Sequence, residues 1–236
     1  MSFNYKAIIL CGGLGSRYNQ NKKRKILKPL VKINNIPMIE RVMNIYKKQG
    51  VSEFFLLGGY KFDDLKKFGQ SYLKKFPKIK IKTIFTGIKT NTGGRLLKIR
   101  KHIDKKDLFF FTYGDSLASF NVNKALKVKT KNNYVISTYK YKLNYGKLDI
   151  KGKILEKINE KKFEIFINAG FYILDYTILE YIKKNSDSFE KIIINKVISK
   201  NRKKFKLVKL NHWAPMDNIY DQKKLESLLL KNDKLF

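Results

Sequence analysis

Residues 6–17 read KAIILCGGLGSR, an apolar run that ends at two adjacent glycines. A compact run of this kind predicts a buried strand, and the glycines predict that its carboxyl end opens into a loop. Such a loop can direct several backbone N–H groups at a phosphate, because glycine has no side chain and allows turns at positive φ. The stretch therefore predicts a phosphate-binding loop at the end of the first strand.

Two familiar phosphate loops do not fit these residues. The ATP-binding P-loop requires Lys-Ser/Thr after its glycines, and none follows at that distance. The dinucleotide fingerprint requires a third glycine where Tyr18 stands, and residues 33–43 offer only Glu40 for the ribose. Both assignments are weak.

The stretch does supply a third glycine, a hydroxyl and a guanidinium at Gly15, Ser16 and Arg17, and Lys28 follows directly before a proline. Two cations and several backbone donors suit a triphosphate, whose charge is spread over many oxygens. A tight turn within a solvated basic loop fits the same residues. The loop alone leaves both interpretations open.

Strand-like runs and helical periodicities alternate along the first half of the chain, which predicts a mostly parallel sheet covered by helices on both faces. After residue 120 strand-like runs predominate, with little helix between them, which indicates an antiparallel excursion. The expected strands are 6–10, 53–59, 78–85, 107–115, 134–142, 146–150, 152–158, 166–174 and 204–210, and the expected helices are 36–50, 62–76, 93–103, 177–185, 189–200 and 218–232.

Composition sets broad limits on function. The formal net charge is +33, but the positive residues are overwhelmingly lysines scattered through every segment. Asn, Ile, Phe and Tyr are also abundant and share A/T-rich codons with Lys, so genome bias accounts for much of the charge. Cys11 is the single cysteine, which rules out an internal disulfide. Without a signal-peptide core or an apolar run of about 18 residues, we expect a cytoplasmic protein.

Two aspartates stand where a sheet would present a ligand site. Asp115 ends the apolar run FFFTYGD, and Asp217 precedes the last expected helix in HWAPMDN. Such a pair could hold Mg²⁺ together with phosphates and water, although each also fits a turn or a helix cap. TNTGGR places Thr90, Thr92 and Arg95 around two glycines at a helix start, where glycine is poor for helix propensity. This predicts that something approaches that backbone.

Taken in order, these segments resemble the sugar-phosphate nucleotidyltransferases, most closely their cytidylyl branch. The resemblance covers nearly the whole chain and rests on KAIILCGGLGSR, KPLVKI, TNTGGRLLKIRKHI, FFFTYGDS, NEKK, FINAGFYIL and WAPMDNIYD. It implies a single Rossmann-like, nucleotide-diphospho-sugar transferase domain over residues 1–236. Within it, residues 1–130 would form the nucleotide-binding half, 131–217 the sugar-phosphate half with its antiparallel excursion after residue 130, and 218–236 the C-terminal helix.

The resemblance also implies roles for individual residues. Arg17, Lys28 and Lys161 would be the catalytic cations, Asp115 and Asp217 would hold Mg²⁺, and Lys161, Asn168 and Gly170 would bind the sugar phosphate. The nucleotide would contact Leu10, Cys11, Gly12, Gly13, Leu14, Gly15, Ser16, Arg17, Lys28, Thr90, Thr92, Arg95 and Gly114.

The implied reaction joins CTP to a sugar-1-phosphate, glucose-1-phosphate or a close relative, by in-line attack at the α-phosphorus, releasing pyrophosphate. Another NTP such as UTP or dTTP, or another phosphate or phosphonate acceptor, keeps the same chemistry. Ser116 and Lys162 depart from the family pattern at a glycine and a proline, which bears on the sugar more than on the reaction. A homo-oligomer is implied, and neither a specific nucleic-acid partner nor membrane insertion is expected; a basic nucleic-acid-binding protein is the alternative outside the enzymes.

Overall fold

A mixed seven-stranded sheet forms the centre of the computed structural model, which describes residues 5–20, 23–143, 145–160 and 163–236. The strand order is β12-β8-β11-β6-β1-β4-β5. β11 runs antiparallel to both of its neighbours, whereas the other adjacent pairs are parallel, so the predicted fold class is confirmed. The strands are β1 (Lys6–Leu10), β4 (Glu53–Gly58), β5 (Lys80–Phe85), β6 (Leu108–Tyr113), β8 (Tyr134–Leu143), β11 (Phe163–Asp175) and β12 (Phe205–Leu210).

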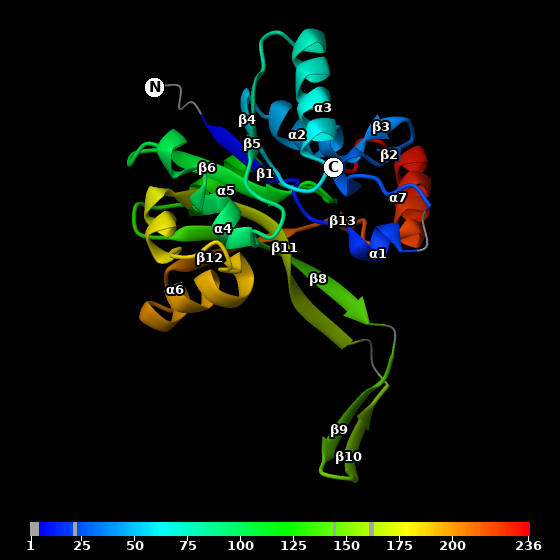
Figure 1. Ribbon diagram of the computed structural model, residues 1–236. Helices are drawn as coiled ribbons and strands as arrows, with labels where there is room; N and C mark the ends of the chain where they lie inside the picture. The colour runs from blue at the N-terminus through cyan, green and yellow to red at the C-terminus, as the bar shows by residue number, and fades with distance from the viewer. Residues whose placement is uncertain (1–4, 21–22, 144, 161–162) are drawn as a thin grey trace.

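Helices cover both faces of this sheet (Figure 1). On β1, Ile9 belongs to the apolar cluster of one face and Ile8 to that of the other, and Phe110 and Phe109 divide in the same way on β6. Burial on both faces explains why these strands read as unbroken apolar runs. One face is covered by α2 (Met38–Lys47), α3 (Phe62–Lys75), α5 (Val122–Val128) and α7 (Ile219–Lys231), and the other by α4 (Thr92–Leu97), η3 (Tyr176–Tyr181), η4 (Phe189–Ile194) and α6 (Asn195–Lys200).

Three expected helices differ from those observed. The helix expected over 93–103 ends at Leu97 and is followed by η2 (Arg100–His102). Residues 176–181 form a 3₁₀ helix, and residues 189–194 form a π-helix that leads into α6. Isoleucines at 99, 103 and 193 are buried against the sheet. Since β-branched residues are weak helix formers, packing on the sheet decides the local conformation there.

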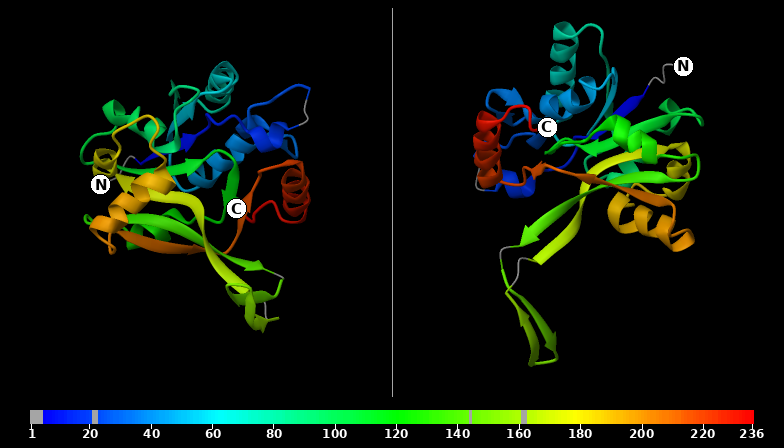
Figure 2. Two further views of the ribbon diagram at one scale, coloured as in Figure 1. Left: turned by 60° about the horizontal axis from the view of Figure 1, so that its bottom comes forward. Right: turned by 180° about the vertical axis from the view of Figure 1, so that it is seen from behind.

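Short strand pairs complete the structure. β2 (Lys32–Ile33) pairs with β3 (Ile36–Pro37), and β7 (Ser116–Ala118) pairs with β13 (Trp213–Pro215). β9 (Lys147–Lys151) and β10 (Ile154–Asn159) form a hairpin that projects away from the body in all three views (Figures 1 and 2). Together with the antiparallel β11, this hairpin is the excursion that the sequence predicts. Within the described part of the chain, no helix is long and apolar enough to cross a bilayer.

Candidate active site

A cavity of about 440 Å³ opens at the carboxyl ends of β1 and β6, the central parallel strands of the sheet. Ligands of open α/β sheets bind at this edge. The residues expected at the nucleotide, the catalytic cations and the metal largely converge on it. Those that line the cavity are Leu10, Cys11, Gly12, Gly13, Gly15, Ser16, Arg17, Lys28, Thr90, Thr92, Arg95, Asp115 and Asp217.

The glycines of the loop after β1 serve different purposes. A Cβ on Gly12 would collide with the Arg95 guanidinium and lie 2.8 Å from the Gly59 nitrogen, so close packing within the protein requires this glycine. Gly15 has φ +60°, a conformation that side chains disfavour. Gly13 is exposed, has no positive φ, and would meet no protein atom within 4 Å. The absence of a side chain at Gly13 therefore keeps space open in the cavity and is not required by packing within the protein.

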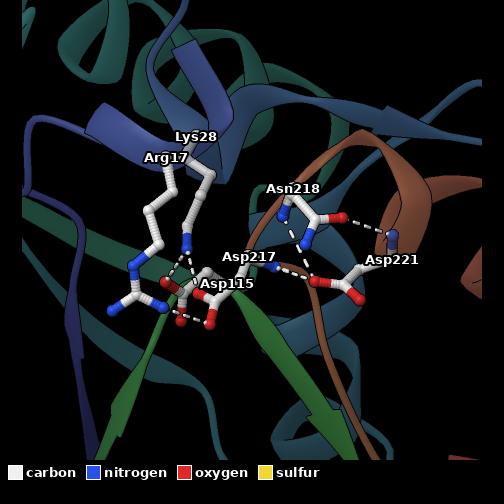
Figure 3. A network of polar contacts seen from close by, with 6 residues as sticks. All are labelled: Arg17, Lys28, Asp115, Asp217, Asn218 and Asp221. Atoms are coloured by element: carbon white, nitrogen blue, oxygen red, sulfur yellow. Dashed lines mark hydrogen bonds and ion pairs between the residues drawn. The ribbon is translucent and has the colours of Figure 1, made fainter. Parts of the chain in front are cut away.

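Lys28 joins the two aspartates (Figure 3). Its ammonium lies 2.7 Å from Asp115 Oδ2 and 3.1 Å from Asp217 Oδ1, and the exposed Arg17 Nη1 lies 2.9 Å from Asp217 Oδ2. Burial acts to lower the pKa of Lys28, but the charges and hydrogen bonds of the two carboxylates outweigh it and raise that pKa. The lysine thus stays protonated, and two distant aspartates meet around one positive charge.

Backbone pairing brings these aspartates together. Asp115 directly precedes β7, and Asp217 follows shortly after β13. Ser116 of β7 and Pro215 of β13 are opposite each other. The Met216 N–H also donates to the Asp115 carbonyl at 2.9 Å. The two carboxylates therefore meet through a short pair of antiparallel strands. This pairing could not be predicted from two residues so far apart in the sequence.

The cap of α7 is Asn218, not Asp217. Its side chain accepts from the Asp221 N–H, and Asp221 accepts from the Asn218 N–H, which makes a capping box. Asp221 Oδ2 also accepts from the Asp217 N–H at 2.8 Å. The backbone of Asp217 is thus fixed while its carboxylate remains directed at Lys28 and Arg17 (Figure 3).

Arg95 holds the walls of the cavity to one another. Its guanidinium is buried and donates to the Gly12 carbonyl (2.9 Å), the Gly58 carbonyl (3.1 Å) and the Thr86 hydroxyl (2.6 Å). Burial lowers the pKa of Arg95. It still lines the cavity, but the donors that form these bonds are committed to the last residue of β4 and to the loops after β1 and β5.

The two threonines near Arg95 are likewise bonded within the protein. The Thr90 hydroxyl donates to the Thr86 carbonyl at 2.6 Å. The Thr92 hydroxyl donates to Glu190 Oε2 at 3.0 Å and accepts from the Phe189 N–H at 2.8 Å. Both residues line the cavity, so their bonds fix its rim.

Cys11 is buried at the end of β1, and burial raises the pKa of its thiol, with the charge of Asp115 adding to the effect. The thiol stays protonated at neutral pH, so it has none of the thiolate character of a nucleophile. A Cβ on Gly114 would lie 3.2 Å from the Cys11 sulfur. Gly114 therefore allows β6 to pack against this loop, although it does not line the cavity, and neither does the exposed Leu14.

Asn168 and Gly170, two of the residues expected at the sugar phosphate, lie outside this cavity. Asn168 donates to the Tyr172 hydroxyl at 2.6 Å and accepts from the Gly170 N–H at 3.0 Å, within β11. Gly170 has φ +79° and lies against the Tyr113 ring. Lys161 falls outside the described residues. Their roles at the sugar phosphate stay predictions.

Sequence reasoning did not identify Tyr113 as a site residue. It lines the cavity at the end of β6, and its hydroxyl is buried without a hydrogen-bond partner among the described residues. An unpaired buried hydroxyl is costly, which suits a contact with a ligand or water. The only sequence signal is its place just before Gly114 and Asp115. The other lining residues that were missed are Tyr18, Pro29, Ile88 and Asn91.

This fold and cavity define an α/β protein with a glycine loop, clustered cations and paired carboxylates at one edge of its sheet. The chain matches the family model described as nucleotidyl transferase over residues 6–217. It therefore belongs to the nucleotidyl transferase family.

Individual relatives agree with this assignment. The chain is 31% identical to a probable glucose-1-phosphate cytidylyltransferase of Bacillus subtilis, over 78% of this chain and 80% of that one. It is 26% identical to glucose-1-phosphate cytidylyltransferase of Salmonella typhimurium, over 94% and 95% of the two chains. The crystal structure of HddC from Yersinia pseudotuberculosis complexed with GMP-PN superposes with a TM-score of 0.71 at 26% identity, over 95% and 99%.

Proposed function

We propose that this protein condenses CTP with a sugar-1-phosphate to give a CDP-sugar and pyrophosphate. The observation that carries the proposal is the placement of Lys28 between Asp115 and Asp217, beside a glycine loop that opens into the cavity. Cations and carboxylates in one cavity can bind two polyanions and a metal together. The acceptor we propose is glucose-1-phosphate or a close relative, on the strength of the two cytidylyltransferase relatives.

The reaction needs positioning more than proton transfer. An oxygen of the sugar phosphate, already ionised at neutral pH, forms a bond to the α-phosphorus, and the bond from that phosphorus to pyrophosphate breaks. No general base is required, which agrees with a cavity whose described lining contains no histidine. Backbone donors of residues 12–16 would hold the nucleotide, and Arg17 and Lys28 would neutralise charge on its phosphates.

The paired aspartates fit Mg²⁺. Both reach the same ammonium group, which shows that they can share one cation, and their side chains are 33% and 46% exposed. No group of three or more acidic, histidine or cysteine ligands occurs among the described residues. Mg²⁺ is commonly held by one or two carboxylates with phosphates and water completing the octahedron. When bound, it would polarise the phosphate oxygens at the reacting phosphorus.

Two nucleobases are candidates for the donor nucleotide. The two relatives in sequence are named as cytidylyltransferases, whereas the related structure holds a guanine nucleotide analogue. GTP is therefore a second candidate donor with the same reaction. We also propose that the enzyme acts in the cytoplasm, where nucleotides and sugar phosphates are available.

The proposal is tested by measuring pyrophosphate release with CTP, GTP, UTP, dTTP and ATP, each with a panel of sugar-1-phosphates and with phosphocholine. We expect CTP with a hexose-1-phosphate to give the highest kcat/KM. Turnover restricted to another NTP would contradict the cytidylyl assignment and leave the reaction class intact. Failure of all combinations, with no NTP binding, would contradict the enzymatic role.

A further inference from the structure

A second cavity, of about 760 Å³, adjoins the active-site cavity. Tyr18 lines both cavities, and the 3₁₀ helix η1 (Lys28–Leu30) also contributes to both. Lys28 and Pro29 line the active-site cavity, whereas Leu30 lines the second one. The remaining walls come from residues 24–32, from the first turns of α3 and from Gln222 of α7. The second cavity is therefore separate from the active site but shares a wall with it.

Most of the charged groups in this second cavity are cationic, and it is called the basic cavity here. Five cations and one carboxylate line it, a net charge of +4: Arg24, Lys25, Lys32, Lys61, Lys67 and Asp64. Lys61 pairs with Asp64 at 3.7 Å. The side chains of the other four cations make no ion pair or hydrogen bond within the described part of the chain. Since like charges that are held together repel each other, a bound anion would stabilise this arrangement.

Positive charge alone does not distinguish this cavity, because the whole chain carries a net charge of +33. A cavity of about 490 Å³ beside α6 is also lined by cations, with Lys183, Lys196, Lys200 and Glu180 giving a net charge of +2. The Lys200 ammonium there lies 5.4 Å from the centre of the Tyr181 ring, a cation–π contact. The basic cavity has twice that net charge, and one of its cations is an arginine. The α6 cavity therefore provides an internal comparison for the effect of diffuse charge.

The size and charge of the basic cavity indicate the chemistry of its ligand. Cavities that bind small molecules are typically about 300–1,000 Å³. A cavity lined by five cations suits a compact ligand that carries several negative charges, and a polyphosphate is such a ligand. The guanidinium of Arg24 can donate two parallel hydrogen bonds to phosphate oxygens. Ile26 and Leu30 add apolar surface to the lining, against which a base or a sugar could pack.

A nucleic-acid strand fits this arrangement less well. Proteins that bind single strands use a basic groove that follows the backbone, together with aromatic side chains on which the bases stack. The cations here surround one hollow. Tyr18, the aromatic side chain in its described lining, is only 3% exposed, so its ring offers no stacking surface. The observations therefore favour a small polyanion.

We propose that the basic cavity binds a polyphosphate group, either free or attached to a nucleoside. Its phosphates contact the four cations that have no partner in the described part of the chain. None of these four cations lines the active-site cavity, so this site is additional to the nucleotide site proposed above. Leu30 brings the bound ligand to the same short helix that carries Lys28 into the active site. The inference does not depend on which nucleotide or acceptor the enzyme uses.

The test compares two double variants of equal charge. Lys32→Glu with Lys67→Glu alters the basic cavity, and Lys196→Glu with Lys200→Glu alters the α6 cavity. All four lysines are exposed, and each pair of changes lowers the net charge by four, so the long-range field is matched. Calorimetry with inorganic tripolyphosphate measures binding. We expect the affinity to fall at least about tenfold in the basic-cavity variant, which loses two charge-assisted contacts, and to stay within about twofold of wild type in the control.

Hydrogen exchange then shows where tripolyphosphate binds. The first turn of α3 has backbone N–H groups without intrahelical acceptors, so they report on a nearby ligand. Residues 61–67 line the basic cavity in part and do not line the active-site cavity. We expect tripolyphosphate to slow exchange in this segment in wild type and in the control, and not in the basic-cavity variant. Circular dichroism melts, and Lys32→Gln with Lys67→Gln as a milder pair, show that the loss does not come from unfolding.

A second titration, with CTP, distinguishes the two sources of the polyphosphate. Weaker binding of both probes in the basic-cavity variant would show that phosphates alone are sufficient, and weaker binding of CTP alone would show that the ligand is a nucleotide. Equal weakening in both double variants, or no protection of residues 61–67 by either probe, would overturn the proposal. So would a loss of affinity for a single-stranded oligonucleotide but for neither probe, which would assign the cavity to a nucleic-acid surface. No turnover is measured, so failure here is distinct from failure of the proposed reaction.

Discussion

Lys28 links two possible states of the site. In the present arrangement its ammonium neutralises both aspartates, at 2.7 and 3.1 Å. The same ammonium is within the cavity where we propose that phosphates bind. A metal on the aspartates and Lys28 on the same oxygens exclude each other. The nucleotide, by attracting Lys28 to its phosphates, would release the carboxylates, so nucleotide and metal should bind cooperatively.

Lys28→Met tests this exchange. Without the ammonium the two carboxylates repel each other, and a divalent cation relieves that repulsion. We expect Mn²⁺ alone, measured by electron paramagnetic resonance, to bind the variant at least about tenfold more tightly, a difference of about 1.4 kcal/mol. Turnover should fall, because the phosphates lose a cation. Equal or weaker Mn²⁺ binding in the variant would contradict the exchange.

Asp217 and Asn218 offer a matched pair. Asp217→Asn removes a proposed metal ligand, worth several kcal/mol of charge stabilisation, so kcat/KM should fall about a thousandfold with the fold intact. Asn218→Ala removes the helix cap, which costs about 1 kcal/mol of stability, and should leave most of the activity. Circular dichroism melts and pyrophosphate release measure both. If Asp217→Asn kept wild-type rates, the carboxylate would have no part in the mechanism.

At the scale of elements, the strands and the glycine loop could be predicted from sequence because they depend on local patterns. The pairing of β7 with β13 could not, since three-residue strands far apart in the chain leave no periodic signal. The role of Arg95 was also hidden: a sequence shows a cation at a helix start, not the carbonyls of Gly12 and Gly58 that accept its hydrogen bonds. The antiparallel hairpin of β9 and β10 was predicted, whereas its projection away from the body was not.

Alanine at two adjacent glycines of the loop separates packing from binding. In Gly12→Ala the new Cβ would clash with Arg95 and the Gly59 backbone, so we expect a loss of about 1–3 kcal/mol of stability. In Gly13→Ala the Cβ enters open space, and stability should change by less than about 0.5 kcal/mol.

The same pair is then compared for nucleotide binding. Gly13→Ala should raise the Kd for the nucleotide measured by calorimetry, because its methyl group occupies space in the cavity. Denaturant unfolding gives the stability of both variants. Unchanged nucleotide affinity in Gly13→Ala would mean that the ligand does not approach this part of the loop.

The junction between α4 and η4 provides a pH test. Glu190 is partly buried, and burial raises its pKa; one oxygen accepts from Thr92 while the other, Oε1, is buried without a hydrogen-bond partner among the described residues. Because the folded state binds the carboxyl proton of Glu190 more tightly than the unfolded state does, the contribution of Glu190 to stability is greatest below its ordinary pKa of 4.5. That contribution is lost as pH rises through the raised value.

Glu190→Gln should therefore raise Tm at pH 7, where wild type carries a poorly solvated carboxylate. The advantage should shrink as the pH falls toward 4.5, where wild-type Glu190 is protonated. Differential scanning calorimetry at several pH values measures it. A gain that grows with falling pH, or a less stable variant at pH 7, would contradict the assigned sign.

For the whole molecule, sequence was sufficient for the fold class because strands buried on both faces read as apolar runs and the helices between them as periodic ones. Sequence was insufficient for three expected helices. In their place the structure has η2 after α4, η3, and η4 leading into α6, because packing on the sheet decides the local geometry there. The net charge of +33 was visible from the start, yet its distribution acquires meaning only in the structure, where residues 145–160 of the projecting hairpin carry a net charge of only +1. The rest of the surface then provides a long-range field.

That field should accelerate the capture of anionic substrates. Raising the ionic strength from about 0.01 to 0.1 M shortens the Debye length from about 30 to about 10 Å, so kcat/KM for the nucleotide should fall roughly tenfold. With Mg²⁺ held constant and substrates saturating, kcat should change much less, because capture then no longer limits the rate. Stopped-flow binding of a fluorescent nucleotide separates association from dissociation. We expect the association rate to fall with salt, which would show that the excess lysines contribute to function whatever their origin. If salt changed only the dissociation rate, the positive charge would act through local contacts with phosphate and not through a long-range field.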